Sequence, residues 1–134
     1  MAALVADTHA VLWYIFSDLR LSASAVAAMD AAALEGDPIY VPSICVVEAT
    51  YLAEKGRIPV TSLERLTSAL RSPEAGFRVA PLDLAVAVEL RQIPRSSVPD
   101  MPDRIIAATA LAMGLPLVTR DGKIRSSDGN VTIW

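Results

Sequence analysis

The sequence predicts a single α/β domain spanning residues 1–134, with a central parallel β-sheet of four to five strands flanked by helices. Short apolar segments alternate with helical patterns along the whole chain. Only one stretch is rich in proline and serine, and there is no internal repeat or interdomain linker. A length of 134 residues is typical of one domain with its own core.

Two helical patterns follow the first predicted strand. Residues 3–6 are apolar and suit a short strand that ends at Asp7. Residues 8–16 have apolar side chains at helical spacing. Residues 22–34 are dominated by alanine, the strongest helix former, and a glycine follows shortly after them. The chain is therefore expected to begin as strand, helix, helix.

The middle of the chain continues this alternation. Residues 39–41 lie between two prolines and predict a second strand. Ser43 stands where the N-cap of an apolar helix over 44–54 belongs. An amphipathic helix is expected over 61–70, with Thr61 as its N-cap and a glutamate three residues later, which is a capping-box pattern.

The rest of the chain predicts three more strands and two more helices. The strands are expected over 77–82, 115–119 and 131–134, and the helices over 83–92 and 103–113, on either side of a Pro- and Ser-rich loop at 93–102. Strands that alternate with helices pair in parallel, so we expect one sheet covered on both faces.

Composition excludes several classes of protein. There are 12 basic and 15 acidic side chains, a net charge of −3, which argues against nucleic-acid binding by bulk positive charge alone. The single cysteine, Cys45, excludes a disulfide framework and a four-cysteine zinc site. No apolar run reaches the roughly 18–20 residues of a membrane span, and the N-terminus does not resemble a signal peptide. We expect a compact cytosolic domain.

Two acidic residues follow predicted strands. Asp7 ends the first strand, and Asp121 lies two residues beyond the strand at 115–119. Open α/β sheets bind ligands at the carboxyl ends of their strands, so both acids are placed for chemistry if the two strands end on one edge. Each also has a structural interpretation, Asp7 as a helix N-cap and Asp121 as part of an Asp-Gly turn.

Two other acids lie on predicted helices. Glu48 is surrounded by apolar residues, and a buried carboxylate without a partner is costly, so we expect it to face a cation, a metal or hydrogen-bond donors. A partly exposed helix face is the alternative. Asp103 opens an apolar helix three residues after Asp100, where an acid also complements the helix dipole. The neighbouring Arg104 could form a salt bridge or contact a phosphate.

Together these acids predict a metal site. Carboxylates confined in one place repel one another unless a cation neutralises them. Mg²⁺ or Mn²⁺ fits oxygen ligands, whereas the single histidine, His9, disfavours zinc hydrolysis and a Cys–His nucleophile. Such an ion lowers the pKa of a bound water and stabilises charge on a reacting phosphate.

Several short segments have a family resemblance. They are Asp7-Thr8-His9-Ala10 with Trp13 shortly after, Pro42-Ser43 followed by Glu48, residues 103–110, residues 117–121 and the terminal residues 131–134. In this order and spacing the whole chain resembles PIN-domain proteins of the VapC toxin type. One departure is that Met101 separates Asp100 from Pro102, where many relatives have proline directly after the acid.

The resemblance implies a metal-dependent endoribonuclease that hydrolyses RNA phosphodiester bonds, the toxin of a type II toxin–antitoxin system. It implies that Asp7, Glu48, Asp103 and Asp121 hold Mg²⁺ or Mn²⁺ and perform catalysis, and that Thr8, Ser43 and Thr119 support them. Asp100 is a ligand or a helix cap. Because the sequence has no basic tail, RNA contacts are left to scattered arginines, with Arg104 and Arg120 as candidates. It also implies a homodimer in the cytoplasm, without membrane association, and a cognate antitoxin that blocks the site.

Three other protein classes are alternatives to a PIN-type endoribonuclease. An RNase H-like nuclease would begin with an antiparallel strand meander, and a haloacid-dehalogenase phosphatase would need an aspartate where His9 stands. The main alternative is a PIN-like RNA- or protein-binding module without catalysis, which predicts missing acids, whereas all four are present. We expect His9 to pack or to hydrogen-bond the backbone, and Cys45 to be a small buried residue.

Overall fold

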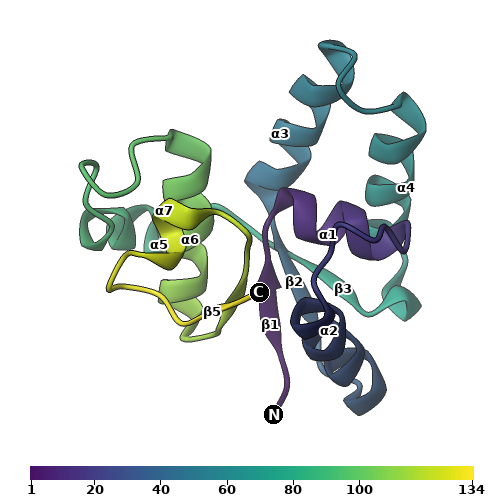
Figure 1. Cartoon of the computed structure of the whole chain (residues 1–134), viewed down its shortest axis with the longest axis horizontal. Helices are drawn as coiled ribbons and strands as arrows, with labels where there is room; N and C mark the ends of the chain where they lie inside the picture. Colours follow the sequence, from purple (N-terminus) through teal and green to yellow (C-terminus); the bar gives the residue numbers. More distant parts are fainter.

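Five parallel strands form one sheet at the centre of the molecule (Figure 1). The computed structural model describes residues 1–134. The strand order is β3-β2-β1-β4-β5, and every neighbouring pair is parallel. The strands are β1 Leu4–Ala6, β2 Ile39–Pro42, β3 Phe77–Ala80, β4 Leu117–Val118 and β5 Thr132–Ile133. The predicted α/β class and parallel sheet are confirmed, at the upper end of the expected number of strands.

Helices cover the sheet on two sides. In Figure 1, α1, α2 and α4 lie on one side of the strands, and α5, α6 and α7 lie on the other. The helices are α1 Thr8–Ile15, α2 Ala23–Glu35, α3 Ser43–Glu54, α4 Val60–Arg71, α5 Leu84–Glu89, α6 Met101–Met113 and α7 Gly122–Arg125, with short 3-10 helices η1 Pro73–Ala75 and η2 Leu90–Gln92. None of these helices is both long and apolar enough to cross a membrane.

Strand β1 lies in the middle of the sheet, between β2 and β4. Val5 is in register with Leu117 and Ala6 with Val118, so β1 and β4 end side by side. The strand order reverses at this pair, which is where open α/β sheets bind ligands. The residues that follow the two strands therefore meet at one edge.

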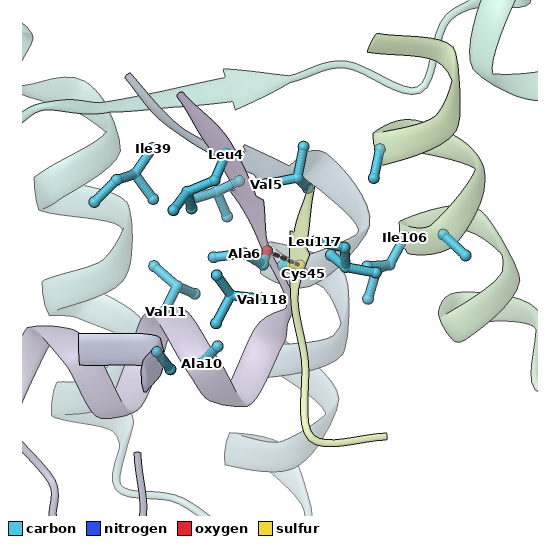
Figure 2. Close-up of a cluster of buried hydrophobic side chains, with 14 of the residues drawn as sticks. Leu4, Val5, Ala6, Ala10, Val11, Ile39, Cys45, Ile106, Leu117 and Val118 are labelled. Atoms are coloured by element: carbon cyan, nitrogen blue, oxygen red, sulfur yellow. Dashed lines mark hydrogen bonds between the residues drawn. The ribbon is translucent and has the colours of Figure 1, made fainter. Parts of the chain in front are cut away.

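Apolar side chains from both layers of helices meet the sheet in one core. Figure 2 shows side chains of β1, β2 and β4 surrounded by Ala10 and Val11 of α1 and Ile106 of α6. All of these side chains are at most 2% exposed, and each large one contributes about 1.5–3 kcal/mol through its burial. Cys45 belongs to this core, so its predicted burial is confirmed. Its Sγ lies 4.0 Å from the carbonyl oxygen of Ala6.

Two predicted helix caps are wrong. Ser43 is the first residue of α3, whose N-cap is Pro42, and its hydroxyl instead accepts a hydrogen bond from the Leu82 N–H at 3.2 Å. Thr61 lies inside α4, which begins one residue earlier, after Pro59. Both prolines have φ near −60° and an extended ψ. Pro42 has φ −54° and ψ 136°, and Pro59 has φ −63° and ψ 147°. This backbone is the one that precedes a helix, so no side-chain cap is needed to start it.

Three predicted boundaries shift by a few residues. The strand predicted over 77–82 ends at Ala80, and Asp83 then caps α5 by accepting a hydrogen bond from the Val86 N–H at 3.0 Å. The helix predicted over 83–92 divides into α5 and η2. Helix α6 begins at Met101 because the Asp100 side chain, at its N-cap, accepts a hydrogen bond from the Asp103 N–H at 3.1 Å.

Candidate functional site

A cleft of about 310 Å³ lies at the carboxyl edge of the sheet, where β1 and β4 end. It is lined by Asp7, Thr8, His9, Glu48, Asp100, Asp103, Ile106, Arg120 and Asp121. All four acids of the predicted cluster are among these residues, together with Asp100. Residues far apart in the sequence thus meet in one cleft, because β1, α3, α6 and the segment after β4 all contribute to it.

Asp7 follows β1 directly and caps α1. Its carboxylate accepts a hydrogen bond from the Ala10 N–H at 2.8 Å, so the cap that the sequence allows is present. Its backbone N–H binds the carbonyl of Val118 at 3.1 Å, which fixes it beside the end of β4. Burial raises the pKa of Asp7, while hydrogen bonds from the Thr119 side chain and the Ala10 N–H oppose that rise. The cap and the place in the cleft coexist in one residue.

Glu48 lies on α3 and is held by Thr8. The Thr8 hydroxyl donates a hydrogen bond to Glu48 Oε1, and Thr8 is itself buried. Glu48 is only partly buried. The core-facing side of α3 is formed by Cys45 and Ala49. Glu48 therefore lies on a partly exposed face of α3, and its carboxylate reaches the cleft wall, where it meets a hydrogen-bond donor of the kind expected for it.

Asp103 also has a perturbed ionisation. Its pKa is raised to about 7, first by partial burial and then by the negative charges of Asp121, Asp100 and Glu48. Asp100 lies at the N-cap of α6, where it caps the helix, and it also lines the cleft. Neighbouring carboxylates thus add to burial in disfavouring the charged form of Asp103.

Asp121 caps the short helix α7. Its Oδ1 accepts hydrogen bonds from the Lys123 N–H at 2.9 Å and the Ile124 N–H at 3.0 Å. Its own N–H donates to the Thr119 hydroxyl oxygen at 3.0 Å, and Thr119 is fully buried. Thr119 therefore connects Asp7 and Asp121, which agrees with the supporting position that the resemblance implies for it.

Two predicted site residues lie elsewhere. The Ser43 hydroxyl binds the Leu82 N–H and does not line the cleft. Arg104 donates from Nε to the Ile93 carbonyl and from an Nη to the Leu90 carbonyl, both at 3.0 Å. Its side chain points from α6 toward η2 and holds the loop there, so Arg104 does not line the cleft. Arg120 does line the cleft.

His9 packs as expected, and it also lines the cleft. It is exposed at the mouth of the cleft, and its ring centroid lies 5.4 Å from that of Trp13. The expected packing contact exists, but it leaves the imidazole accessible. The sequence feature that indicates its place in the cleft is its position two residues after Asp7, in the first turn of a helix that begins at the cleft.

The donor set fits a hard divalent cation by its chemistry. Five carboxylates line the cleft with no cysteine, and burial together with three of these neighbouring charges raises the pKa of Asp103. Mg²⁺ and Mn²⁺ prefer such oxygen ligands. With the side chains as they stand, no three Asp, Glu, His or Cys residues converge closely enough to hold an ion together. The fit of the cleft to such an ion therefore rests on the charge and chemistry of its carboxylates and not on the distances between them.

Comparison with known proteins places this fold and cleft in a family. Residues 4–130 match the model of the PIN domain. The chain belongs to the PIN domain family. This PIN domain is 35% identical over 141 residues to Ribonuclease VapC22 of Mycobacterium tuberculosis (strain ATCC 25618 / H37Rv), and the match covers 100% of both chains.

Solved structures share the fold. This PIN domain resembles VapBC2 from Rickettsia felis, solved with a DNA fragment from the VapBC2 promoter, with a TM-score of 0.70 and 16% identity over 97% of this chain and 96% of the other. It also resembles a toxin–antitoxin complex from Klebsiella pneumoniae, with a TM-score of 0.63 and 24% identity over 96% of each chain. The acidic cleft is thus built on a fold that toxin–antitoxin complexes also use.

Proposed function

We propose that the protein is a divalent-metal-dependent endoribonuclease, the toxin of a type II toxin–antitoxin system. The observation that supports this most directly is the meeting of Asp7, Glu48, Asp103 and Asp121 in one cleft at the carboxyl edge of the sheet. The likeness to a protein named as a ribonuclease, at 35% identity over the whole chain, gives the substrate class. As part of this proposal, the protein would act on RNA in the cytoplasm.

The four carboxylates would hold Mg²⁺ or Mn²⁺, which when bound supplies an activated water and stabilises charge on the phosphate. Thr8 orients the carboxylate of Glu48. Thr119 and the Ala10 N–H hold Asp7, and two backbone N–H groups hold Oδ1 of Asp121. Hydrogen-bond donors thereby orient three of the four carboxylates, as donors around metal-ligating side chains commonly do.

Two kinds of protein partner accompany this proposal. A cognate antitoxin would cover the cleft, by analogy with the toxin–antitoxin complexes that share the fold.

A second copy of the chain would form a homodimer through exposed apolar side chains on α3 and on the segment after β3, namely Val47, Tyr51, Leu82, Leu84 and Val88. The Ser43–Leu82 hydrogen bond joins these two segments. The molar mass measured by light scattering tests this proposal. Wild type should be a dimer and Leu84→Glu a monomer. A monomeric wild type would contradict it.

Cleavage of a structured RNA tests the proposed activity. Wild type should cleave in Mg²⁺ and stop when EDTA is added, and Asp7→Asn should lose activity by several orders of magnitude. Asp128→Asn, which changes an exposed acid outside the cleft, is the matched control and should cleave like wild type. Equal cleavage by wild type and Asp7→Asn would overturn the proposal.

One observation favours a second function, a PIN-like module that binds RNA or protein without catalysis. No three acids converge on one point in this structure, as they would in a site already assembled for an ion. Such a module would bind RNA equally well with and without Mg²⁺ and leave it intact over hours. The same cleavage assay therefore separates the two functions.

A further inference from the structure

Arg120 is the only arginine or lysine that lines the acidic cleft, yet it forms no ion pair with the five carboxylates there. It directly precedes Asp121 and is exposed. A guanidinium this close to several carboxylates would ordinarily turn to one of them. The single ion pair of the protein joins Arg20 to Asp18, outside the cleft.

The guanidinium of Arg120 lies on an aromatic ring instead. Its Cζ is 4.8 Å from the centroid of Trp13, a distance at which the ring face attracts a cation. This contact leaves the N–H edge of the guanidinium available, because stacking uses the face of the group and hydrogen bonds use its rim. Arg120 is thus held near the acids without being neutralised by them.

Trp13 is a fixed support for this contact. Its side chain is 6% exposed, and its ring lies 6.1 Å from Trp134 and 5.4 Å from His9. A second guanidinium, that of Arg20, also lies 4.8 Å from the Trp13 centroid. Arg20 is held in turn by Asp18, with hydrogen bonds of 2.8 and 3.1 Å from two of its nitrogens.

We propose that Arg120 binds a phosphate of the RNA strand at the mouth of the acidic cleft, and that Trp13 is a positioning residue that keeps its guanidinium there. This inference rests on the proposed ribonuclease function. A cleft lined by five carboxylates repels a polyanion, so a pre-placed, unneutralised cation at its mouth lowers the cost of bringing a phosphate to the acids. The planar fork of a guanidinium matches phosphate oxygens in two parallel hydrogen bonds.

The first test compares Arg120→Gln with Arg125→Gln, which removes the same charge from an exposed arginine outside the cleft. For a single-stranded RNA oligonucleotide, we expect Arg120→Gln to raise KM at least about tenfold. We expect the slope of log affinity against log salt to fall by about 0.7, the value for one phosphate contact. Arg125→Gln should change KM less than about twofold. Identical KM values and salt slopes in the two variants would overturn the proposal.

The second test separates positioning from a merely structural role of Trp13. Trp13→Phe keeps an aromatic ring in the core but weakens the attraction to a cation. It should raise KM in the same direction as Arg120→Gln, and the double variant should be no worse than Arg120→Gln alone. Additive effects would show that Trp13 acts independently of Arg120 and would overturn its positioning role.

Two further outcomes have defined meanings. If Arg120→Gln weakens binding of an antitoxin while RNA kinetics stay unchanged, the arginine serves the protein partner and the proposal is overturned. If wild type itself shows no Mg²⁺-dependent cleavage, the ribonuclease function fails, which is distinguishable from a failure of Arg120 alone because the latter leaves wild-type cleavage intact.

Discussion

The hydroxyl of Thr8 donates a hydrogen bond to Oε1 of Glu48, joining the first residue of α1 to the middle of α3. Thr8 is 2% exposed, while Glu48 reaches the cleft. A buried donor that can rotate little thus fixes the direction of a carboxylate on another element. This cross-link determines where one of the four acids points.

Replacing Thr8 with valine should reduce RNA cleavage about 10- to 100-fold, the usual cost of losing a group that orients a metal ligand. Thr8→Ser keeps the hydroxyl and should retain most activity. Thr109→Val is the matched control, because the buried Thr109 hydroxyl binds only the Ile105 carbonyl of its own helix. Steady-state cleavage rates measure all three. Equal losses in Thr8→Val and Thr109→Val would show that the Thr8–Glu48 bond is not what matters.

Asp103→Asn should make the metal-free protein more stable above neutral pH. The pKa of Asp103 is raised to about 7, so the folded state holds a proton that the unfolded chain releases near pH 4. The free energy of unfolding therefore falls as pH rises from about 4 to about 7. Because Asp103 is partly exposed, we expect a gain of about 1 kcal/mol for Asp103→Asn at pH 8 and none at pH 4.

Thermal unfolding in EDTA at pH 4 and pH 8 measures this effect, with Asp128→Asn as the control for a general loss of negative charge. In saturating Mg²⁺ at pH 8, wild type should instead be the more stable of the two proteins, because wild type binds the ion and Asp103→Asn binds it poorly. A variant that is less stable than wild type at pH 8 in EDTA would contradict the account of charge repulsion in the cleft.

Arg104→Gln should destabilise the fold without changing RNA recognition. Its guanidinium bonds the carbonyls of Leu90 and Ile93, and losing both bonds should cost about 1 to 2 kcal/mol. Arg95→Gln, at an exposed loop position, should leave stability unchanged. Denaturant unfolding gives the stability, and RNA binding at several salt concentrations gives the recognition. A reduced salt dependence of binding in Arg104→Gln alone would restore its sequence-based assignment as an RNA contact.

Much of the fold could be predicted from the sequence because strand and helix patterns differ in period. The positions of Asp7 and Asp121 after strands were enough to place them at one edge, since parallel strands share their carboxyl ends. The starts of α3 and α4 could not be predicted from capping patterns. Proline backbone geometry, rather than the Ser43 or Thr61 side chain, begins these helices.

The direction of individual side chains was less predictable. Arg104 and Arg120 are both arginines next to a cleft acid, yet one turns to loop carbonyls and the other to an aromatic ring. Glu48 was selected because its neighbours are apolar, but its cleft position depends on Thr8, which is 40 residues away in the sequence. Such partners are tertiary contacts, and local periodicity contains no information about them.

Calorimetric titration with Mn²⁺ tests the central claim, that the clustered carboxylates form a divalent-metal site, most directly. Wild type should bind with a Kd below about 1 mM and release protons on binding near pH 7, because Asp103 must ionise. Asp103→Asn should weaken binding at least about tenfold, while Asp128→Asn should bind like wild type. Absence of binding by wild type at millimolar Mn²⁺, or equal binding by wild type and Asp103→Asn, would contradict the account.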